Sequence, residues 1–353
     1  MRLDDLAREA TASLVTDTTP DTVTGLADLK RTNRRRASAR AVGAGVAVAA
    51  LVGGWFAITA NGPTEPEPAA PVVRNGVLLL GGDKGFHKVD GVGRPLDLPV
   101  DRARYSEFSF TADGSEIVYT TNRAVIVAHD VASGAARELW DCPHPSPCFG
   151  SVSPDGQQLA VPVDEGIEVH RVDGDGVDLL DTPEPPEPFV AWSPDGGTLA
   201  FTGTAGLYTV DADGTDLRNV VTFEGPRASY VRPEWSPDGN SIAYIEDEAL
   251  EQPDTQGRPV PSEYFLRLVD RDGDSVRTLQ ALGSCYCIGI SPPDLAWAPD
   301  GSSIAFTKVI GLRNGDNARA DGVHLLDLGT GTTKMLSGGE TGNLAWQPLL
   351  AAP

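Results

Sequence analysis

Residues 191–203 are AWSPDGGTLAFTG, and versions of this stretch occur five times along the chain. In each version a Pro-Asp-Gly type turn precedes apolar residues that recur at every second position, as Leu199 and Phe201 do. Proline presets its own φ, aspartate can accept a hydrogen bond from the backbone two residues on, and glycine supplies a positive φ. Each turn therefore predicts a hairpin of two antiparallel strands. The turn aspartates are Asp113, Asp155, Asp195, Asp238 and Asp300.

The spacing of these aspartates predicts the architecture. The first three intervals are 42, 40 and 43 residues, and the fourth, of 62 residues, must contain an insertion. A period near 40 residues fits a four-stranded propeller blade. A second marker, an apolar strand that ends in Asp before a Gly-containing turn, follows each hairpin and predicts the outer hairpin of the blade. It also occurs once ahead of the first blade, around Asp90.

The two ends of the repeat array predict how it closes. Residues Asn343 to Leu350, NLAWQPLL, repeat the apolar strand and the tryptophan of the motif near the C-terminus. We predict that this strand joins the segment from about Val77 to Leu98 and completes a sixth blade, because such a clasp removes the open edge of a linear array. The predicted fold class is an all-β, six-bladed β-propeller over residues 76–350.

The repeat resembles that of the TolB-like, WD-repeat-like propellers. The WSPDGxxIAF pattern with a downstream VDxDG hairpin carries the resemblance, which covers roughly Val77 to Leu350 and rests on five matches. The resemblance implies a six-bladed propeller outside the cytoplasm that binds partners and carries no chemistry of its own. The fold alone does not determine the function, because propellers host many activities.

The region before the repeats predicts a membrane anchor. Residues 41–60 contain no charge and are long enough to cross about 30 Å of hydrocarbon as a helix. Six basic residues precede them within residues 30–40, so the positive-inside rule places a tail of residues 1–40 in the cytoplasm and the propeller outside. The alternative is a cleaved signal peptide. No cysteine ends the apolar run, which departs from the lipoproteins of this family. Residues 61–75 predict a proline-rich stalk.

Net charge excludes one class of partner. The chain carries −22, and residues 1–40 hold eight basic and six acidic side chains, which leaves −24 on the remainder. A domain this acidic is not expected to bind nucleic acid.

Four cysteines form two clusters in connections between blades. In an oxidising compartment they predict disulfides, and three connectivities are open. A soft metal site that uses these thiols with His144 is the alternative, although the spacing matches no zinc motif. The disulfide candidates are Cys142, Cys148, Cys285 and Cys287.

We expect no catalytic residue, no bound metal and no cofactor. No GxSxG motif is present, and the five histidines are scattered over different blades. Three Asp-rich turns, near Asp173, Asp211 and Asp270, lack the twelve-residue calcium-binding frame and predict hairpin turns.

Two segments break the blade period, Glu246 to Ser262 and Val309 to Gly322. Both follow the second strand of a blade and predict long loops, which either bind a ligand or are tolerated insertions. The candidate binding residues in these loops are Glu246, Asp247, Glu248, Arg313 and Arg319.

Together these features predict a single-pass protein of the cell envelope. Its propeller is expected to act as a non-catalytic binding or scaffolding module for envelope proteins or a peptidic or glycan ligand. An alternative is a signalling component whose cytoplasmic tail binds a transcription regulator, in the manner of an anti-sigma protein. A weaker alternative is a metal-dependent propeller hydrolase.

Overall fold

The computed structural model describes residues 73–82, 85–89, 108–121, 123–142, 149–174, 176–224, 232–249, 262–285, 293–310, 319–339 and 342–350. The chain divides into two units, Met1–Glu67 and Pro68–Pro353. The first unit lies outside the described residues. The predicted tail and membrane segment therefore stay predictions. The predicted stalk, residues 61–75, is too long at its end, because residues 73–75 already pair with β23 as the start of a strand, and its residues 61–72 lie outside the described residues. Within the described part, no helix has the length and apolar character needed to span a bilayer.

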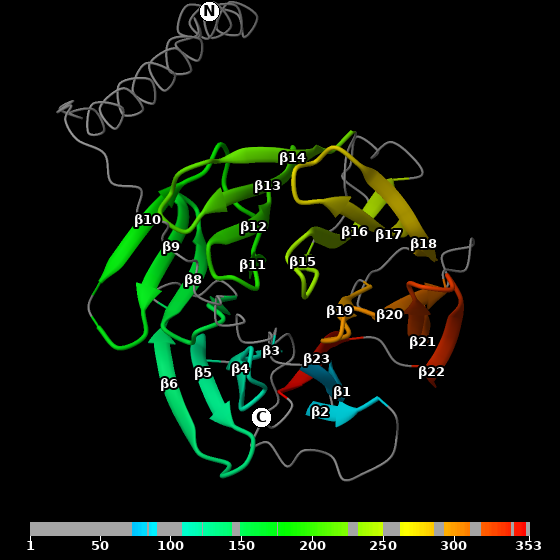
Figure 1. The fold of residues 1–353 in the computed structure, drawn as a ribbon, viewed down its shortest axis with the longest axis horizontal. Coiled ribbons are helices and arrows are strands. Elements are labelled where there is room, and N and C mark those ends of the chain that lie inside the picture. The colour runs from blue at the N-terminus through cyan, green and yellow to red at the C-terminus, as the bar shows by residue number, and fades with distance from the viewer. Residues whose placement is uncertain are drawn as a thin grey trace, which may run out of the picture. The chain divides into compact units, whose positions relative to one another are not determined.

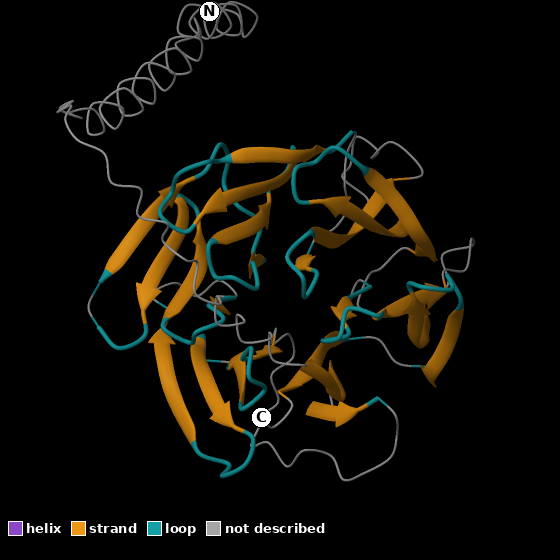
Figure 2. Cartoon of the chain, viewed as in Figure 1, coloured by secondary structure: helices purple, strands orange, loops and turns teal. Residues whose placement is uncertain are grey.

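The described residues form six antiparallel sheets arranged in a ring (Figure 1). Every regular element of this part is a strand (Figure 2). The first blade has β3 (Phe108–Phe110), β4 (Glu116–Thr120), β5 (Val125–Asp130) and β6 (Ala136–Asp141). The second has β7 (Ser151–Val152), β8 (Gln158–Val163), β9 (Gly166–Arg171) and β10 (Val177–Asp181). The third has β11 (Val190–Trp192), β12 (Thr198–Thr202), β13 (Gly206–Asp211) and β14 (Arg218–Thr222).

The fourth and fifth blades have longer strands. The fourth has β15 (Pro233–Trp235), β16 (Ser241–Ala249), β17 (Ser262–Asp270) and β18 (Val276–Cys285). The fifth has β19 (Leu295–Trp297), β20 (Ser303–Ile310), β21 (Arg319–Asp327) and β22 (Thr333–Gly338). The closing sheet has the order β2-β1-β23, with β1 (Val73–Gly82), β2 (Gly85–Lys88) and β23 (Asn343–Leu350).

The closing sheet confirms the predicted clasp and corrects the predicted blade count. β1 pairs antiparallel with β23, and Leu78 lies opposite Trp346. The described structure has five four-stranded blades rather than six, because only three strands of the closing sheet lie among the described residues. The region between β2 and β3, which would have to supply a fourth strand, lies outside them.

The core consists of six hydrophobic clusters, and each lies between two neighbouring sheets. For example, Leu79 and Ala345 of the closing sheet pack with Phe108 and Ile117 of the first blade. On its other side the closing sheet packs against the fifth blade. The remaining clusters join successive blades around the ring. Burial is therefore distributed over every interface, including the two that close the ring.

The repeated tryptophans hydrogen-bond successive blades to one another. Trp192 Nε1 donates to the Ser151 carbonyl of the preceding blade at 2.8 Å. Trp235 donates in the same way to Ala191 at 3.2 Å, and Trp297 donates to Glu234 at 3.3 Å. In each case the acceptor lies on the innermost strand of the preceding blade. The motif tryptophan thus has a structural role, as a contact between neighbouring inner strands.

Candidate functional site

The strand order defines two faces of the ring. The Pro-Asp-Gly turns and the turns between the third and fourth strands of each blade lie on one face, which we call the turn face. The connections between second and third strands, and those from one blade to the next, lie on the opposite face, which we call the loop face. This assignment follows from the antiparallel order of strands in every sheet.

The five turn aspartates lie on the turn face and hold their turns closed. In the third blade, the Ser193 hydroxyl donates to Asp195 Oδ1 at 2.6 Å, and the Gly197 amide donates to the same oxygen at 3.0 Å. The Thr198 amide donates to Ser193 Oγ at 2.9 Å. The Ser193 hydroxyl, followed by the Gly197 amide, lowers the pKa of Asp195. The sequence prediction that these aspartates are structural is consistent with this geometry.

In the fifth turn the aspartate forms hydrogen bonds with a residue of the closing sheet. Ala298 replaces the serine there, and the Asn75 amide group donates to Asp300 Oδ2 at 2.8 Å. Asn75 Oδ1 in turn accepts from the Asp300 amide at 3.0 Å. Strand β1 therefore contacts the turn of the neighbouring blade through a side chain far away in sequence.

The candidate loop acids lie in a strand, which corrects the sequence prediction. Glu246, Asp247 and Glu248 belong to β16 and pair with Phe265, Tyr264 and Glu263 of β17. Arg267 of β17 forms ion pairs with both Glu246 and Glu248 on one side of the hairpin. Asp247 is buried instead.

The second predicted loop is also shorter than expected. Pairing of β20 with β21 extends to Ile310 and Arg319. Arg313 and the side chain of Arg319 lie outside the described residues. The two segments that break the blade period are thus largely extensions of strand pairs, directed toward the loop face.

One of the four cysteines has a described side chain. Cys142 is disulfide-bonded, as expected. Cys148, Cys287 and the side chain of Cys285 lie outside the described residues. The three possible connectivities stay open.

Sequence reasoning missed a set of residues around the axis of the ring. They lie three positions before the motif tryptophan or the residue that replaces it, where each innermost strand begins on the loop face. Aligning the repeats on that position would have found them. The described members are Phe149, Phe189, Arg232, Asp294 and Asn343. We call them the axial arc.

Contacts within the axial arc join neighbouring sheets. The rings of Phe149 and Phe189 are 5.3 Å apart between centroids. Arg232 Nη1 lies 3.0 Å from Asp294 Oδ2, and the Leu344 amide donates to that oxygen at 2.7 Å. Two aromatic rings and one ion pair therefore occupy consecutive positions around the axis.

Asp294 is the most buried charge in this arc. Its side chain is 7% exposed and that of Arg232 is 17% exposed. Burial raises the pKa of Asp294, and the Arg232 guanidinium opposes this effect. The Asp294 amide and carbonyl also bond Thr307, so the loop-face end of the fifth blade is fixed by hydrogen bonds.

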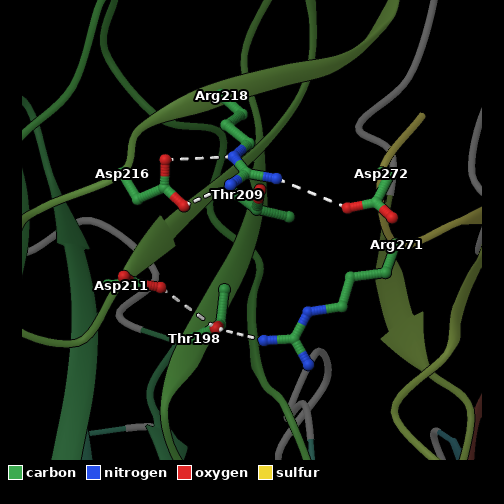
Figure 3. Close-up of a pocket in the computed structure, with 7 residues that line it drawn as sticks. All are labelled: Thr198, Thr209, Asp211, Asp216, Arg218, Arg271 and Asp272. Atoms are coloured by element: carbon green, nitrogen blue, oxygen red, sulfur yellow. Dashed lines mark hydrogen bonds and ion pairs between the residues drawn. The ribbon is translucent and has the colours of Figure 1, made fainter. Parts of the chain in front are cut away.

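A small polar pocket lies on the turn face, at the seam between the third and fourth blades (Figure 3). Its volume is about 180 Å³. The third blade supplies most of the lining, and the turn between β17 and β18 supplies the rest. The lining residues are Thr198, Thr209, Asp211, Asp216, Arg218, Arg271 and Asp272. We call it the seam pocket.

Both arginines of the seam pocket already contact carboxylates. Arg218 Nη2 lies 2.5 Å from Asp216, and its Nη1 reaches across the seam to Asp272 at 3.4 Å. Arg271 reaches back across the seam, where its Nη2 donates to Thr198 Oγ1 at 3.0 Å. Its Nη1 lies 3.6 Å from Asp195. These crossing contacts also link the two blades.

Within the described ranges, no group of three or more His, Cys, Asp or Glu residues could hold a metal ion. His144 and the side chains of Cys148, Cys285 and Cys287 lie outside these ranges.

Comparison with known proteins supports the fold. No family model matches the sequence, and no curated protein matches it at a significant level. By structure the chain is similar to TolB from Acinetobacter baumannii, with a TM-score of 0.55 and 18% identity over 77% of this chain and 66% of that protein. The chain therefore spans slightly less than two thirds of that protein's length.

Two further structures are similar. For a TolB-like protein from Agrobacterium tumefaciens the TM-score is 0.51, with 16% identity over 80% of this chain and all of that one. For an oligogalacturonate lyase from Vibrio parahaemolyticus the TM-score is 0.42, with 14% identity over 75% and 73% of the two chains, too low to bear on function. The structure neighbours include TolB and TolB-like propellers, which confirms the resemblance inferred from the repeats at the level of the fold.

Proposed function

We propose that this protein is a membrane-anchored, non-catalytic binding module whose propeller lies outside the cytoplasm and docks a protein partner on its loop face. We infer the docking face from the longer strands of the fourth and fifth blades. Strands β16 and β17 have nine residues each, whereas β12 and β13 of the third blade have five and six. The second and third strands of these blades begin and end at equivalent positions on the turn face. The extra residues therefore all project from the loop face.

The extended hairpins offer chemistry that suits a partner. Glu248 is half exposed beside Arg267, and Ile310 at the end of β20 is 49% exposed. The axial arc begins on the same face, where it adds two half-buried aromatic rings. Aromatic and apolar anchors surrounded by charged groups are the usual composition of a protein-binding surface.

The docking face is tested by a matched pair of substitutions. Ile310→Glu places a charge on the loop-face hairpin, and Met335→Glu places one on the outer strand β22, where the side chain is 54% exposed. In cells that express the full chain, cross-linking to a specific partner is expected to fall at least tenfold with Ile310→Glu and to persist with Met335→Glu. Equal cross-linking by both variants would refute the loop face as the docking surface.

The anchoring part of the proposal rests on residues 41–60 and the basic residues before them. Protease added to intact spheroplasts is expected to digest the propeller while a tag at residue 1 stays protected. Deletion of residues 41–60 should release the propeller from the membrane fraction. A protected propeller, or one that sediments with membranes without this segment, would contradict the anchor.

A further inference from the structure

The seam pocket contains a polar residue at a position that is apolar in the other four four-stranded blades. Thr209 lies two residues before the end of β13, and its equivalents face the next sheet in the same way. These equivalents are Ala128, Val169, Leu268 and Leu325. Thr209 is only 4% exposed and lines the pocket. No hydrogen bond joins its hydroxyl to a described residue, so this group can bond a molecule that enters the pocket.

Asp211 departs from the repeat as well. The equivalent Asp130 closes its own turn, because its Oδ1 accepts from the Ala132 and Ser133 amides at 3.1 and 2.6 Å. Asp327 does the same with the Thr330 amide at 2.7 Å. In the third blade the Thr215 amide bonds Asp213 instead, at 3.0 Å.

The Asp211 carboxylate is therefore directed to the pocket. Its Oδ1 accepts from Thr198 Oγ1 at 3.3 Å, and its Oδ2 has only a long contact of 3.5 Å to Thr215 Oγ1. Among the described residues Asp211 forms no ion pair, whereas Asp216 and Asp272 both pair with Arg218. The Thr209 hydroxyl and the Asp211 carboxylate thus line one small pocket (Figure 3). Both can accept hydrogen bonds, and neither has the role of its equivalents in the other blades.

The charge of the lining selects the ligand. Three carboxylates face two guanidinium groups, and both guanidinium groups are already within ion-pair distance of carboxylates. An anion would have to displace these pairs and would lie near Asp211. A cation with several N–H donors can use Asp211 and Thr209 without breaking any of them.

We propose that the seam pocket binds a primary ammonium group, such as that of a lysine side chain. This inference goes beyond the proposed function and does not depend on it, because the pocket lies on the turn face and the proposed docking surface lies on the loop face. The ammonium donates to the Asp211 carboxylate and to the Thr209 hydroxyl, which supplies the partner that this hydroxyl lacks.

Ligand-detected NMR titration of the purified full chain tests the site. The probes are Nα-acetyl-lysine N-methylamide and its Nε-acetylated form, which has the same chain without the charge. The charged probe is expected to bind with a Kd of about 1–10 mM, the range of one charge-assisted site. The acetylated probe should show no saturable binding at those concentrations. Equal binding of both probes, or none of the charged one, would overturn the proposal.

Three variants locate the probe. Asp211→Asn is expected to weaken binding at least tenfold, and Thr209→Val, which keeps the shape of the side chain, at least threefold. Asp327→Asn is the matched control at the same position of the fifth blade and should bind as the parent protein does. Unchanged binding by Asp211→Asn, or equal loss with Asp327→Asn, would refute the site.

The same variants distinguish failure of this proposal from failure of the proposed docking face. Ile310→Glu should bind the lysine probe normally, and Asp211→Asn should retain cross-linking to the loop-face partner. Loss of probe binding in Ile310→Glu would place the ammonium site outside the seam pocket.

Discussion

At the scale of single residues, a serine and an aspartate organise three of the five turns. Ser153, Ser193 and Ser236 each donate to the aspartate two residues on and accept from the amide five residues on. Side chains of the turn therefore form the hydrogen bonds that its backbone amides need. For this reason the Pro-Asp-Gly pattern predicts the turn without any tertiary information.

Replacing Ser193 by Ala should destabilise the fold by about 1–3 kcal/mol, because it leaves the buried Thr198 amide without its acceptor. The free energy of unfolding in urea measures the effect. Ser302→Ala is the control: its hydroxyl donates to Asp300 at an exposed site, and about 0.5 kcal/mol or less should be lost. If both variants lost the same free energy of unfolding, the unpaired Thr198 amide would not be the cause of the destabilisation.

The same carboxylates predict how stability depends on pH. Hydrogen bonds from Ser153, Ser193 and Ser236 lower the pKa of Asp155, Asp195 and Asp238 in the folded protein. A lowered folded pKa contributes stability that is fully present above the unfolded value of about 3.9 and is lost as pH falls through the folded value. Asp294 acts in the opposite sense, because burial raises its pKa.

Since the lowered groups are more numerous, the urea midpoint should fall steeply below about pH 4 and change little between pH 5 and 7. Measurements at pH 7, 5, 4 and 3 check this expectation. Ser193→Ala should show a shallower fall, because its Asp195 has lost the main cause of the lowered pKa. A midpoint that is equal at pH 3 and pH 7 would contradict the assignment.

At the scale of elements, the innermost strands are held to one another by the motif tryptophans. Val152 stands at this position in the second blade and Phe110 in the first, so an indole is not required for the strand itself. Its contribution is the hydrogen bond to the preceding blade. Sequence periodicity found the tryptophans, but only the register shows which carbonyl each one meets.

Trp235→Phe should cost about 1–2 kcal/mol, since it removes the donor to the Ala191 carbonyl and leaves a smaller aromatic ring under Arg271. Urea unfolding of the full chain measures the change. Phe110→Leu, at the position that natively has no indole, controls for general loss of aromatic packing. If Trp235→Phe unfolds at the same urea concentration as the parent, the tryptophan acts through packing alone.

At the scale of the whole molecule, β23 closes the ring through contacts with the first blade and within its own sheet. Gln347 Nε2 donates to the Gly114 carbonyl of the first blade at 2.8 Å. Trp346 Nε1 donates to Gly76 of β1 at 3.2 Å, rather than to the fifth blade as the repeat would predict. The terminal strand thus replaces the usual contact between blades by one within its own sheet.

A pair of glycine substitutions isolates this closure. Gly114 and Gly156 occupy the same turn position, with φ of 70° and 71°. A Cβ on Gly114 would lie 2.0 Å from the Pro348 carbonyl oxygen, whereas nothing lies within 4 Å of one on Gly156. Both substitutions to Ala carry the cost of a positive φ, about 1 kcal/mol, but only Gly114→Ala forces β23 away.

Gly114→Ala should therefore destabilise the protein by at least about 2 kcal/mol more than Gly156→Ala. Hydrogen exchange should also accelerate selectively at the amides of β1 and β23. Comparing urea unfolding and exchange rates of the two variants checks both expectations. Similar behaviour would mean that the closing strand is not tightly held at this point.

The sequence by itself determined the repeat, the turn chemistry, the strand type and the pairing of the two chain ends, because each depends on local residue preferences and a fixed period. It overestimated the number of complete blades in the described structure and placed Glu246–Glu248 in a loop, because it cannot show where strand pairing stops.

Only the tertiary structure brought Arg232 to Asp294 and Arg271 to Thr198, since these contacts cross between blades. The same is true of Thr209 and Asp211, which look ordinary along the chain and stand out only beside their equivalents in the other four-stranded blades. Contacts between repeats depend on how neighbouring sheets pack, and no single repeat contains that information.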